Sequence, residues 1–191
     1  MSEQQPGRRE RKKAATRLAI ANTALQLFLE KGYDAVGIRE VAQAADVAVT
    51  TVFAHFSSKE ALVFDRDQGI QDRLIGALTG RASGRSVPEA LRAELHALVG
   101  EFTADGSSPF WRMVNDSADL REYEARMWLR HADALAAALA ADRGRPGDVT
   151  ISDRALARFV LGVHPLVRDA PDPVAAVDEI MNLFAAAWSA A

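Results

Sequence analysis

Two short helical patterns separated by only two residues constrain the fold of this chain more than any other feature. The segment 37–45 (GIREVAQAA) carries its apolar residues at helical spacing, and a second helix follows directly after Asp46 and Val47. In that second helix, Val52 and Phe56 lie four residues apart and share the inward face. Aspartate tolerates the left-handed backbone that a tight turn requires. The pattern therefore predicts a helix-turn-helix.

The outward face of the second helix is not explained by core packing. Val49, Thr50, Phe53 and Ala54 fall together on that face, so small hydroxyl and apolar groups share one short surface. We expect a molecule outside the chain to contact it.

Helical spacing also dominates the rest of the chain, and no alternating strand pattern is found. Capping-box patterns at 57–60 and 86–89 start further helices, the first of which is expected to run toward Gly80. We therefore predict an all-α fold with about nine helices. Its three segments are a basic flexible arm (1–13), a helix-turn-helix domain (14–57) and a larger C-terminal bundle (58–191).

Charge is distributed unevenly along the chain. Residues 1–60 contain 9 Lys and Arg against 7 Asp and Glu, whereas the net charge of the whole chain is −3. Six basic residues and one acidic residue lie between Arg8 and Arg17, which favours a polyanionic partner at this end. The alternative is a solvated, disordered tail. There is no cysteine, no bilayer-length apolar run and no signal-peptide core, so we expect a cytoplasmic protein without thiol chemistry.

From about Thr16 to Val63 the sequence resembles the tetracycline-repressor (TetR) family of bacterial transcriptional regulators. The resemblance is carried by ALQLFLEKGYDAVGIREVAQAADVAVTTVFAHFSSKEAL, residues 24–62. It implies a homodimer that binds a palindromic DNA operator and is released when a small-molecule effector enters the C-terminal bundle. The bundle would then serve both ligand binding and dimerisation.

The resemblance also implies which side chains face DNA, with Val49, Thr50 and Phe53 on the base-reading face. Hydroxyl and cationic groups would position the protein on phosphates, and apolar groups would meet thymine methyl groups. Phe53 stands where the family usually has tyrosine, and Ala48 where a capping Ser or Thr is common. The implied DNA-contact residues are Arg39, Val49, Thr50, Thr51, Phe53, His55 and Lys59.

Apolar and aromatic residues of the bundle provide candidates for an effector cavity, although they are equally consistent with a plain core. The effector is expected to be largely apolar or aromatic. The candidate pocket residues are Leu95, Phe102, Phe110, Trp111, Met113, Trp128, His131 and Phe159.

Two apolar stripes predict the dimer interface, one on a helix over about 152–167 and one on a helix over 173–190. The alternative is that both stripes pack only onto their own subunit. The candidate interface residues are Leu156, Val160, Val163, Val177, Ile180, Met181, Phe184 and Trp188.

An all-α enzyme is disfavoured because the chain has no GxSxG motif, phosphate loop, metal-ligand spacing or obvious acid–base pair. The sequence therefore predicts no metal and no other cofactor. The remaining alternative is a helical small-molecule-binding or protein-interaction module that no longer binds specific DNA.

Overall fold

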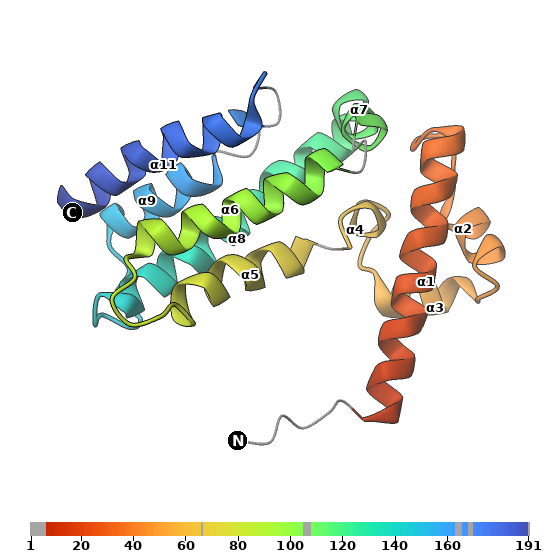
Figure 1. Cartoon of the computed structure of the whole chain (residues 1–191). Coiled ribbons are helices and arrows are strands. Elements are labelled where there is room, and N and C mark those ends of the chain that lie inside the picture. The colour runs from red at the N-terminus through yellow and green to blue at the C-terminus, as the bar shows by residue number, and fades with distance from the viewer. Residues whose placement is uncertain (1–6, 66, 105–107, 163–165, 168–169, 191) are drawn as a thin grey trace. The chain divides into compact units, whose positions relative to one another are not determined.

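A computed structural model of the chain describes residues 7–65, 67–104, 108–162, 166–167 and 170–190. Within these residues the structure contains ten α-helices and no strand (Figure 1), which confirms the all-α prediction. The helices are α1 (Arg8–Lys31), α2 (Ile38–Ala44), α3 (Val49–His55), α4 (Glu60–Val63), α5 (Asp67–Thr79), α6 (Val87–Ala104), α7 (Ser108–Asp116), α8 (Ala118–Asp142), α9 (Ile151–Leu161) and α11 (Pro173–Ala190). None of these helices combines the length and apolar character that crossing a bilayer requires.

The chain forms two compact units. The first comprises the described residues of Met1–Asp65 together with Ser108–Tyr123, and the second comprises those of Arg66–Ser107 and Glu124–Ala191. The first unit thus contains α4 and α7 in addition to the three helices that the sequence placed there.

The first unit is built around the inward face of α1. Ile20 and Phe28 of α1 are fully or almost fully buried, and Val52 and Phe56 pack into the same unit from α3 and the residue after it. The predicted tight turn is confirmed, because Asp46 has a φ of 52°. The α1 helix ends at Lys31 and is followed by Gly32, whose φ of 90° is readily adopted only by glycine.

The predicted flexible arm is helical from Arg8 onward. Arginine, lysine, glutamate and alanine are strong helix formers, and they dominate residues 8–15. The Gly7 N–H also donates to the Glu10 carboxylate at 3.2 Å, which closes the first turn. The N-terminal cations therefore lie on a helix and are exposed.

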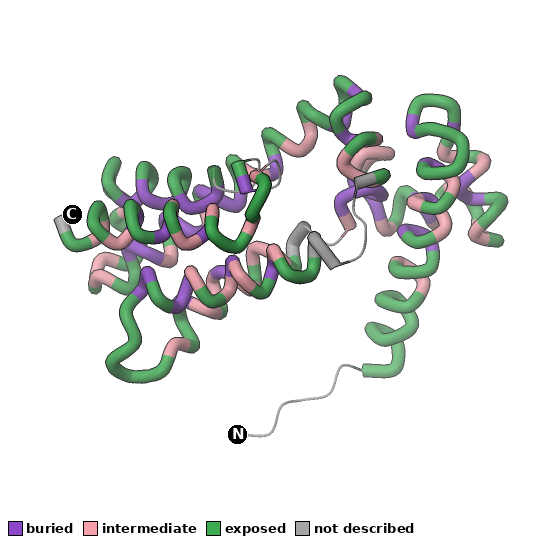
Figure 2. The backbone as a smooth tube through the Cα atoms, turned by 45° about the horizontal axis from the view of Figure 1, so that its top comes forward, coloured by how far each residue is buried: buried purple, intermediate pink, exposed green. Residues whose placement is uncertain are grey.

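The second unit is a helical bundle with one apolar core. Figure 2 shows its buried residues as stripes along the helices. The α11 helix packs against α6 and α9, and α5 packs against α6. The fully or almost fully buried residues of this core include Leu78 from α5, Leu91 from α6, Leu135 and Leu139 from α8, Val160 from α9 and Phe184 from α11.

Helix termini follow the sequence signals in some places and not in others. The capping box at Ser86 and Glu89 is confirmed, because the Ser86 N–H donates to the Glu89 carboxylate at 2.8 Å. At the start of α11 the Asp172 carboxylate accepts from the N–H groups of Val174 and Ala175, as an N-cap does. At the start of α4, however, the Ser58 hydroxyl accepts from Ala61, so the predicted capping box with Ser57 as N-cap is wrong.

Two predicted helices are shorter than their periodicity indicated. The helix expected from residue 60 to Gly80 is divided, because α4 ends at Val63 and α5 begins at Asp67. Between them Phe64 turns inward and stacks on Tyr123, with ring centroids 5.4 Å apart. The helix expected to reach residue 167 ends at Leu161. A proline at position 165 would clash with the carbonyl of residue 161 in a continuing helix.

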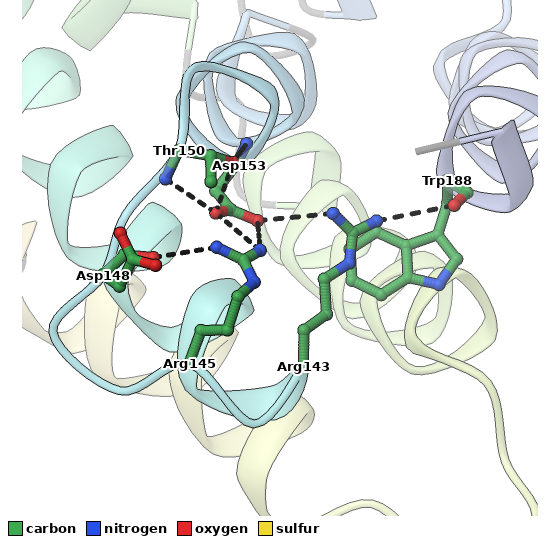
Figure 3. Close-up of polar contacts among 6 residues, drawn as sticks. All are labelled: Arg143, Arg145, Asp148, Thr150, Asp153 and Trp188. Atoms are coloured by element: carbon green, nitrogen blue, oxygen red, sulfur yellow. Dashed lines mark hydrogen bonds and ion pairs between the residues drawn. The ribbon is translucent and has the colours of Figure 1, made fainter.

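The buried carboxylate of Asp153 holds the linker that follows α8 in place against α9 and α11 (Figure 3). Asp153 is fully buried and accepts from the Thr150 N–H at 2.9 Å and from Arg145 at 3.0 Å. Arg143 reaches the same carboxylate at 3.3 Å and lies over the Trp188 ring, 3.9 Å from its centroid. Burial pushes the pKa of Asp153 up, but the bonds from Thr150 and Arg145 outweigh it and hold the pKa below its ordinary value. This cluster joins the N-terminus of α9 to the C-terminal end of α11.

Candidate nucleic-acid interface

The α3 helix divides into a buried and an exposed face. Val52 is buried, as is Phe56 directly after the helix, whereas Thr50, Phe53 and Ala54 are exposed. Phe53 is 56% exposed, although phenylalanine is among the residues most often found fully buried. The structure thus leaves free the face that the sequence assigned to an outside partner.

The remaining predicted DNA-contact residues surround this face to different degrees. Arg39 is exposed in the first turn of α2. Beside it, Lys31 bonds to the Glu40 carboxylate at 2.6 Å, a contact that also raises the pKa of Lys31. Because Glu40 is paired in this way, its negative charge is partly compensated next to Arg39. Val49, Thr51, His55 and Lys59 are half-buried.

Lys59 has protein partners of its own. Its Nζ donates to the Tyr33 carbonyl at 2.6 Å and lies 4.0 Å from the centroid of the Tyr33 ring. Burial lowers the pKa of Lys59. The Tyr33 hydroxyl in turn donates to Glu60 at 2.7 Å, and burial together with this carboxylate raises the pKa of Tyr33. These contacts tie the start of α4 to the turn after α1, and they leave two N–H groups of Lys59 for a phosphate.

The N-terminus of α3 has no side-chain cap, as the alanine at position 48 predicts. The Ala48 carbonyl instead accepts from the Thr51 N–H at 2.9 Å and from the Val52 N–H at 3.3 Å. The helix is therefore held at this end by its own backbone and by the packing of Val52.

Arg17 supports the opposite end of α3, a role that its place among the six N-terminal cations did not predict. Its Nη1 donates to the His55 carbonyl, and its Nε donates to Asp65 at 2.6 Å. Its guanidinium also lies over the Phe56 ring, 4.3 Å from the centroid. A signal for this role was present, because position 17 shares the helical face of the buried residues Ile20 and Ala24.

Comparison with known proteins agrees with this geometry. The family model described as "Bacterial regulatory proteins, tetR family" matches residues 20–65. The HTH-type transcriptional regulator TcmR of Streptomyces glaucescens is 29% identical over 170 residues, which cover 85% of this chain and 74% of TcmR. Residues 20–65 of this chain therefore match the TetR family of bacterial transcriptional regulators, and the similarity to TcmR extends over most of the chain.

Solved structures of TetR-like fold extend the similarity over most of the chain. Native NalD of Pseudomonas aeruginosa, the secondary repressor of the MexAB-OprM multidrug efflux pump, has a TM-score of 0.58 and 24% identity, covering 92% of this chain and 96% of NalD. A SmeT–triclosan complex has a TM-score of 0.57 and 22% identity, covering 88% of this chain and 91% of SmeT. At these identities the likeness shows the fold.

The predicted effector-pocket residues are divided between the two units of the chain. Phe110, Trp111 and Met113 belong to the first unit. The other described members belong to the second, where Leu95 and His131 are buried and Phe159 is 40% exposed. The His131 ring contacts Trp128 edge-on, with centroids 5.5 Å apart. The side chain of Phe102 lies outside the part of the chain that the structure describes.

The predicted dimer residues are mostly core residues of their own subunit. Five of them, Leu156, Val160, Val177, Met181 and Phe184, are buried within the single chain. Ile180 and Trp188 are half-buried, and Val163 lies outside the described residues. Within the single chain these five residues are covered by packing inside their own subunit, where α11 packs against α6 and α9. The exposed large apolar residues on the described parts of α9 and α11 are Ile151, Phe159, Val174 and Leu183.

Proposed function

We propose that this chain is a cytoplasmic, ligand-responsive TetR-family regulator, a repressor, that binds a palindromic operator as a homodimer. The observation that carries the proposal is the free face of α3. Thr50 and Phe53 are exposed there, while Val52 and Phe56 anchor the helix from below. A helix held on one side and free on the other has the geometry that major-groove recognition requires.

Within this proposal, Val49, Thr50 and Phe53 read base edges, and Arg39, Thr51, His55 and Lys59 contact the DNA backbone. The apolar members suit thymine methyl groups, and the Thr50 hydroxyl can donate to or accept from a base. The exposed N-terminal cations of α1 add positive charge, which raises affinity without reading sequence.

We place the proposed subunit interface on the exposed apolar stripe formed by Phe159 of α9 and Leu183 of α11. This stripe lies next to the mostly buried residues that the sequence predicted for the interface. Phe159 of α9 stacks on Phe184 of α11, with centroids 6.4 Å apart, so the outer edges of the two helices adjoin. Leu183 is 59% exposed beside this pair, and the neighbouring alanines 186 and 187 are exposed and small enough for close helix approach. Two such helices from each subunit would form a four-helix bundle. Ile180 and Trp188 would border that bundle.

The proposed effector is a largely apolar or aromatic small molecule. Trp128 and His131 place an aromatic pair inside the second unit, and Leu95 lies in its core. The SmeT–triclosan complex supports the proposal, since a protein of the same fold binds an aromatic compound. A ligand that favours the DNA-free conformation would release the operator by shifting the population toward that conformation.

Selection of bound sequences from random duplexes tests the proposal directly. We expect a palindromic site with half-sites about 34–36 Å apart, one DNA helical turn. Binding should then be followed by fluorescence anisotropy at several salt concentrations for the wild type, Arg39→Ala and Lys59→Ala. Each variant should lose about 1–2 kcal/mol on every duplex and show a salt slope reduced by about one.

The matched control is Arg154→Ala, which removes an exposed arginine that pairs with Asp133 in the second unit. It should leave both affinity and salt slope unchanged. Failure of the wild type to enrich any duplex would favour the alternative module that no longer binds specific DNA.

A further inference from the structure

We propose that Arg17 is a positioning residue for operator recognition, joining the C-terminal end of α3 to the residue at which the chain leaves the first unit. This inference rests on the proposed DNA-binding function. It assigns a role in base reading to a side chain that touches no base.

The geometry consists of three contacts made by one guanidinium. Nη1 donates to the carbonyl of His55, the last residue of α3, and Nε donates to the carboxylate of Asp65 at 2.6 Å. The plane of the group covers the ring of Phe56, which is almost fully buried. A planar, forked cation is the side chain that can make two directed bonds and a ring contact together.

The α3 helix depends on such support because it is short. It has seven residues, so its own backbone bonds provide little stability, and no side chain caps its N-terminus. Its last carbonyl groups have no partners within the helix, and a cation beside them is favourable for both hydrogen bonding and the helix dipole. Arg17 supplies both at His55, two residues after the exposed Phe53.

The same guanidinium connects α3 to the exit from the first unit. Asp65 is the last residue of the first segment of that unit, and its side chain is only 14% exposed. A backbone shift at Asp65 would therefore move the Arg17 guanidinium and, through the His55 carbonyl, the end of α3. Because base recognition requires side chains held within about 0.5 Å, a small displacement there changes specific binding.

The ion pair itself contributes little to stability. The Arg17 side chain is 42% exposed, and ion pairs with exposed members are weak. Loss of the contact should therefore change the geometry of α3 more than the free energy of unfolding. This separates a positioning role from a purely structural one.

The test compares Arg17→Gln, Arg17→Lys and Asp65→Asn with the wild type on the selected operator and on a scrambled duplex, at several salt concentrations. Glu30→Gln is the matched control, because Glu30 is an exposed acid on α1 and the change also removes one negative charge. Thermal unfolding is followed for every variant. The double variant Arg17→Gln with Asp65→Asn completes the cycle.

We expect Asp65→Asn to weaken operator binding roughly threefold to tenfold, which lies within the range of coupling that residues in contact show. Charge alone predicts the opposite change in affinity, because Asp65→Asn removes a negative charge and so reduces repulsion of the DNA. Glu30→Gln, which removes the same charge elsewhere, should bind the operator slightly more tightly than the wild type or equally well. Arg17→Lys should be as weak as Arg17→Gln, because a lysine cannot make the paired bonds. The double variant should be no weaker than Arg17→Gln, and the salt slope and scrambled-duplex affinity should stay those of the wild type.

The opposite pattern would overturn the role. If Asp65→Asn binds the operator as tightly as Glu30→Gln, and Arg17→Lys as tightly as the wild type, Arg17 is a phosphate contact or a bystander. An equal loss on both duplexes, together with a lower melting temperature, would show a structural role only. Should Arg17→Gln fail to fold, Asp65→Asn decides alone. A wild type that selects no operator would refute the proposed function and this role with it.

Discussion

The α3 and α11 helices are both amphipathic, yet their two faces are built for different neighbours. The outer face of α3 is exposed at Thr50 and Phe53, and Val52 is the buried residue on the inner face of this helix. The α11 helix buries Val177, Met181 and Phe184 completely and exposes Leu183 on its outer side. A surface with hydroxyl groups suits phosphates and base edges, whereas an alkyl surface next to small residues suits another helix. The exposed face, and not the amphipathic pattern, distinguishes the two functions.

The difference also appears in how charges are used. Near α3 the exposed Arg39 is available to a polyanion. On α11 the acidic Asp178 is paired with Arg92 at 3.3 Å and with His96 at 2.9 Å, both from α6. These pairs lie on the side of α11 that faces its own subunit. The exposed large apolar residues of α11, Val174 and Leu183, are the ones that we propose to face a second copy.

The largest effect is expected from placing charge on the exposed apolar stripe. Phe159→Glu with Leu183→Glu should yield a folded monomer, because both positions are exposed in the single chain and buried in the proposed dimer. Operator affinity should fall by roughly 4 kcal/mol, about a thousandfold, while non-specific binding changes little. Sedimentation and anisotropy measure the two outcomes. As a contrast, Phe184→Ala should cost about 3–5 kcal/mol of unfolding free energy. A dimer that persists in the double variant would place the interface elsewhere.

The next effect concerns the buried carboxylate that holds the ends of α9 and α11 together. Asp153→Asn should lower the unfolding free energy of the chain by about 3 kcal/mol at neutral pH, because Arg143 and Arg145 lose their charged partner. The pKa of Asp153 is below its unfolded value of 3.8, so its stabilisation is present above that pH and is lost as the pH falls through the lower folded value.

Urea unfolding between about pH 2 and pH 7 checks this prediction. The wild type and Asp153→Asn should differ most at neutral pH and converge in strong acid. The exposed Asp133 pairs with Arg154, so Asp133→Asn serves as a surface control with a change below about 1 kcal/mol. A difference that stays constant with pH would contradict the assignment of the carboxylate charge.

A smaller effect is expected on the outer face of α3. Thr50→Ala should change base preference at one or two symmetric positions of the operator, at a cost of about 1–3 kcal/mol for the lost contact. Repeated selection with the variant measures it. The control is Ser57→Ala, which truncates an exposed hydroxyl after the end of α3. Identical selected sites for the wild type and Thr50→Ala would remove Thr50 from the reading face.

The smallest effect is a gain. Phe53→Tyr adds a hydroxyl at the exposed position where the family usually carries tyrosine. A hydrogen bond from it to a phosphate should tighten binding by about 0.5–1.5 kcal/mol on every duplex. Anisotropy on the operator and on the scrambled duplex should show equal gains. A gain on the operator alone would instead indicate base contact.

The sequence was most informative where structure is local. Asp46 predicted the tight turn of the helix-turn-helix, and Ser86 with Glu89 predicted the start of α6, because both signals act between residues a few positions apart. The inward face of α3 followed from the spacing of Val52 and Phe56. Part of the candidate DNA-contact site could be predicted in the same way, because the residues opposite Val52 and Phe56 have to lie on the exposed face of α3.

What the sequence determined by itself is therefore the likeness to the TetR family over residues 20–65, the all-α class and the position of α3, because each depends on patterns between residues that are close in the chain. Tertiary structure alone decided what covers each apolar stripe. Periodicity shows that Val177 and Phe184 are buried, but whether α6 of the same chain or a second subunit buries them depends on packing between distant segments. The same holds for Arg17, whose partners His55 and Asp65 lie 38 and 48 residues away. A helical pattern specifies a face, and only the folded chain supplies its neighbour.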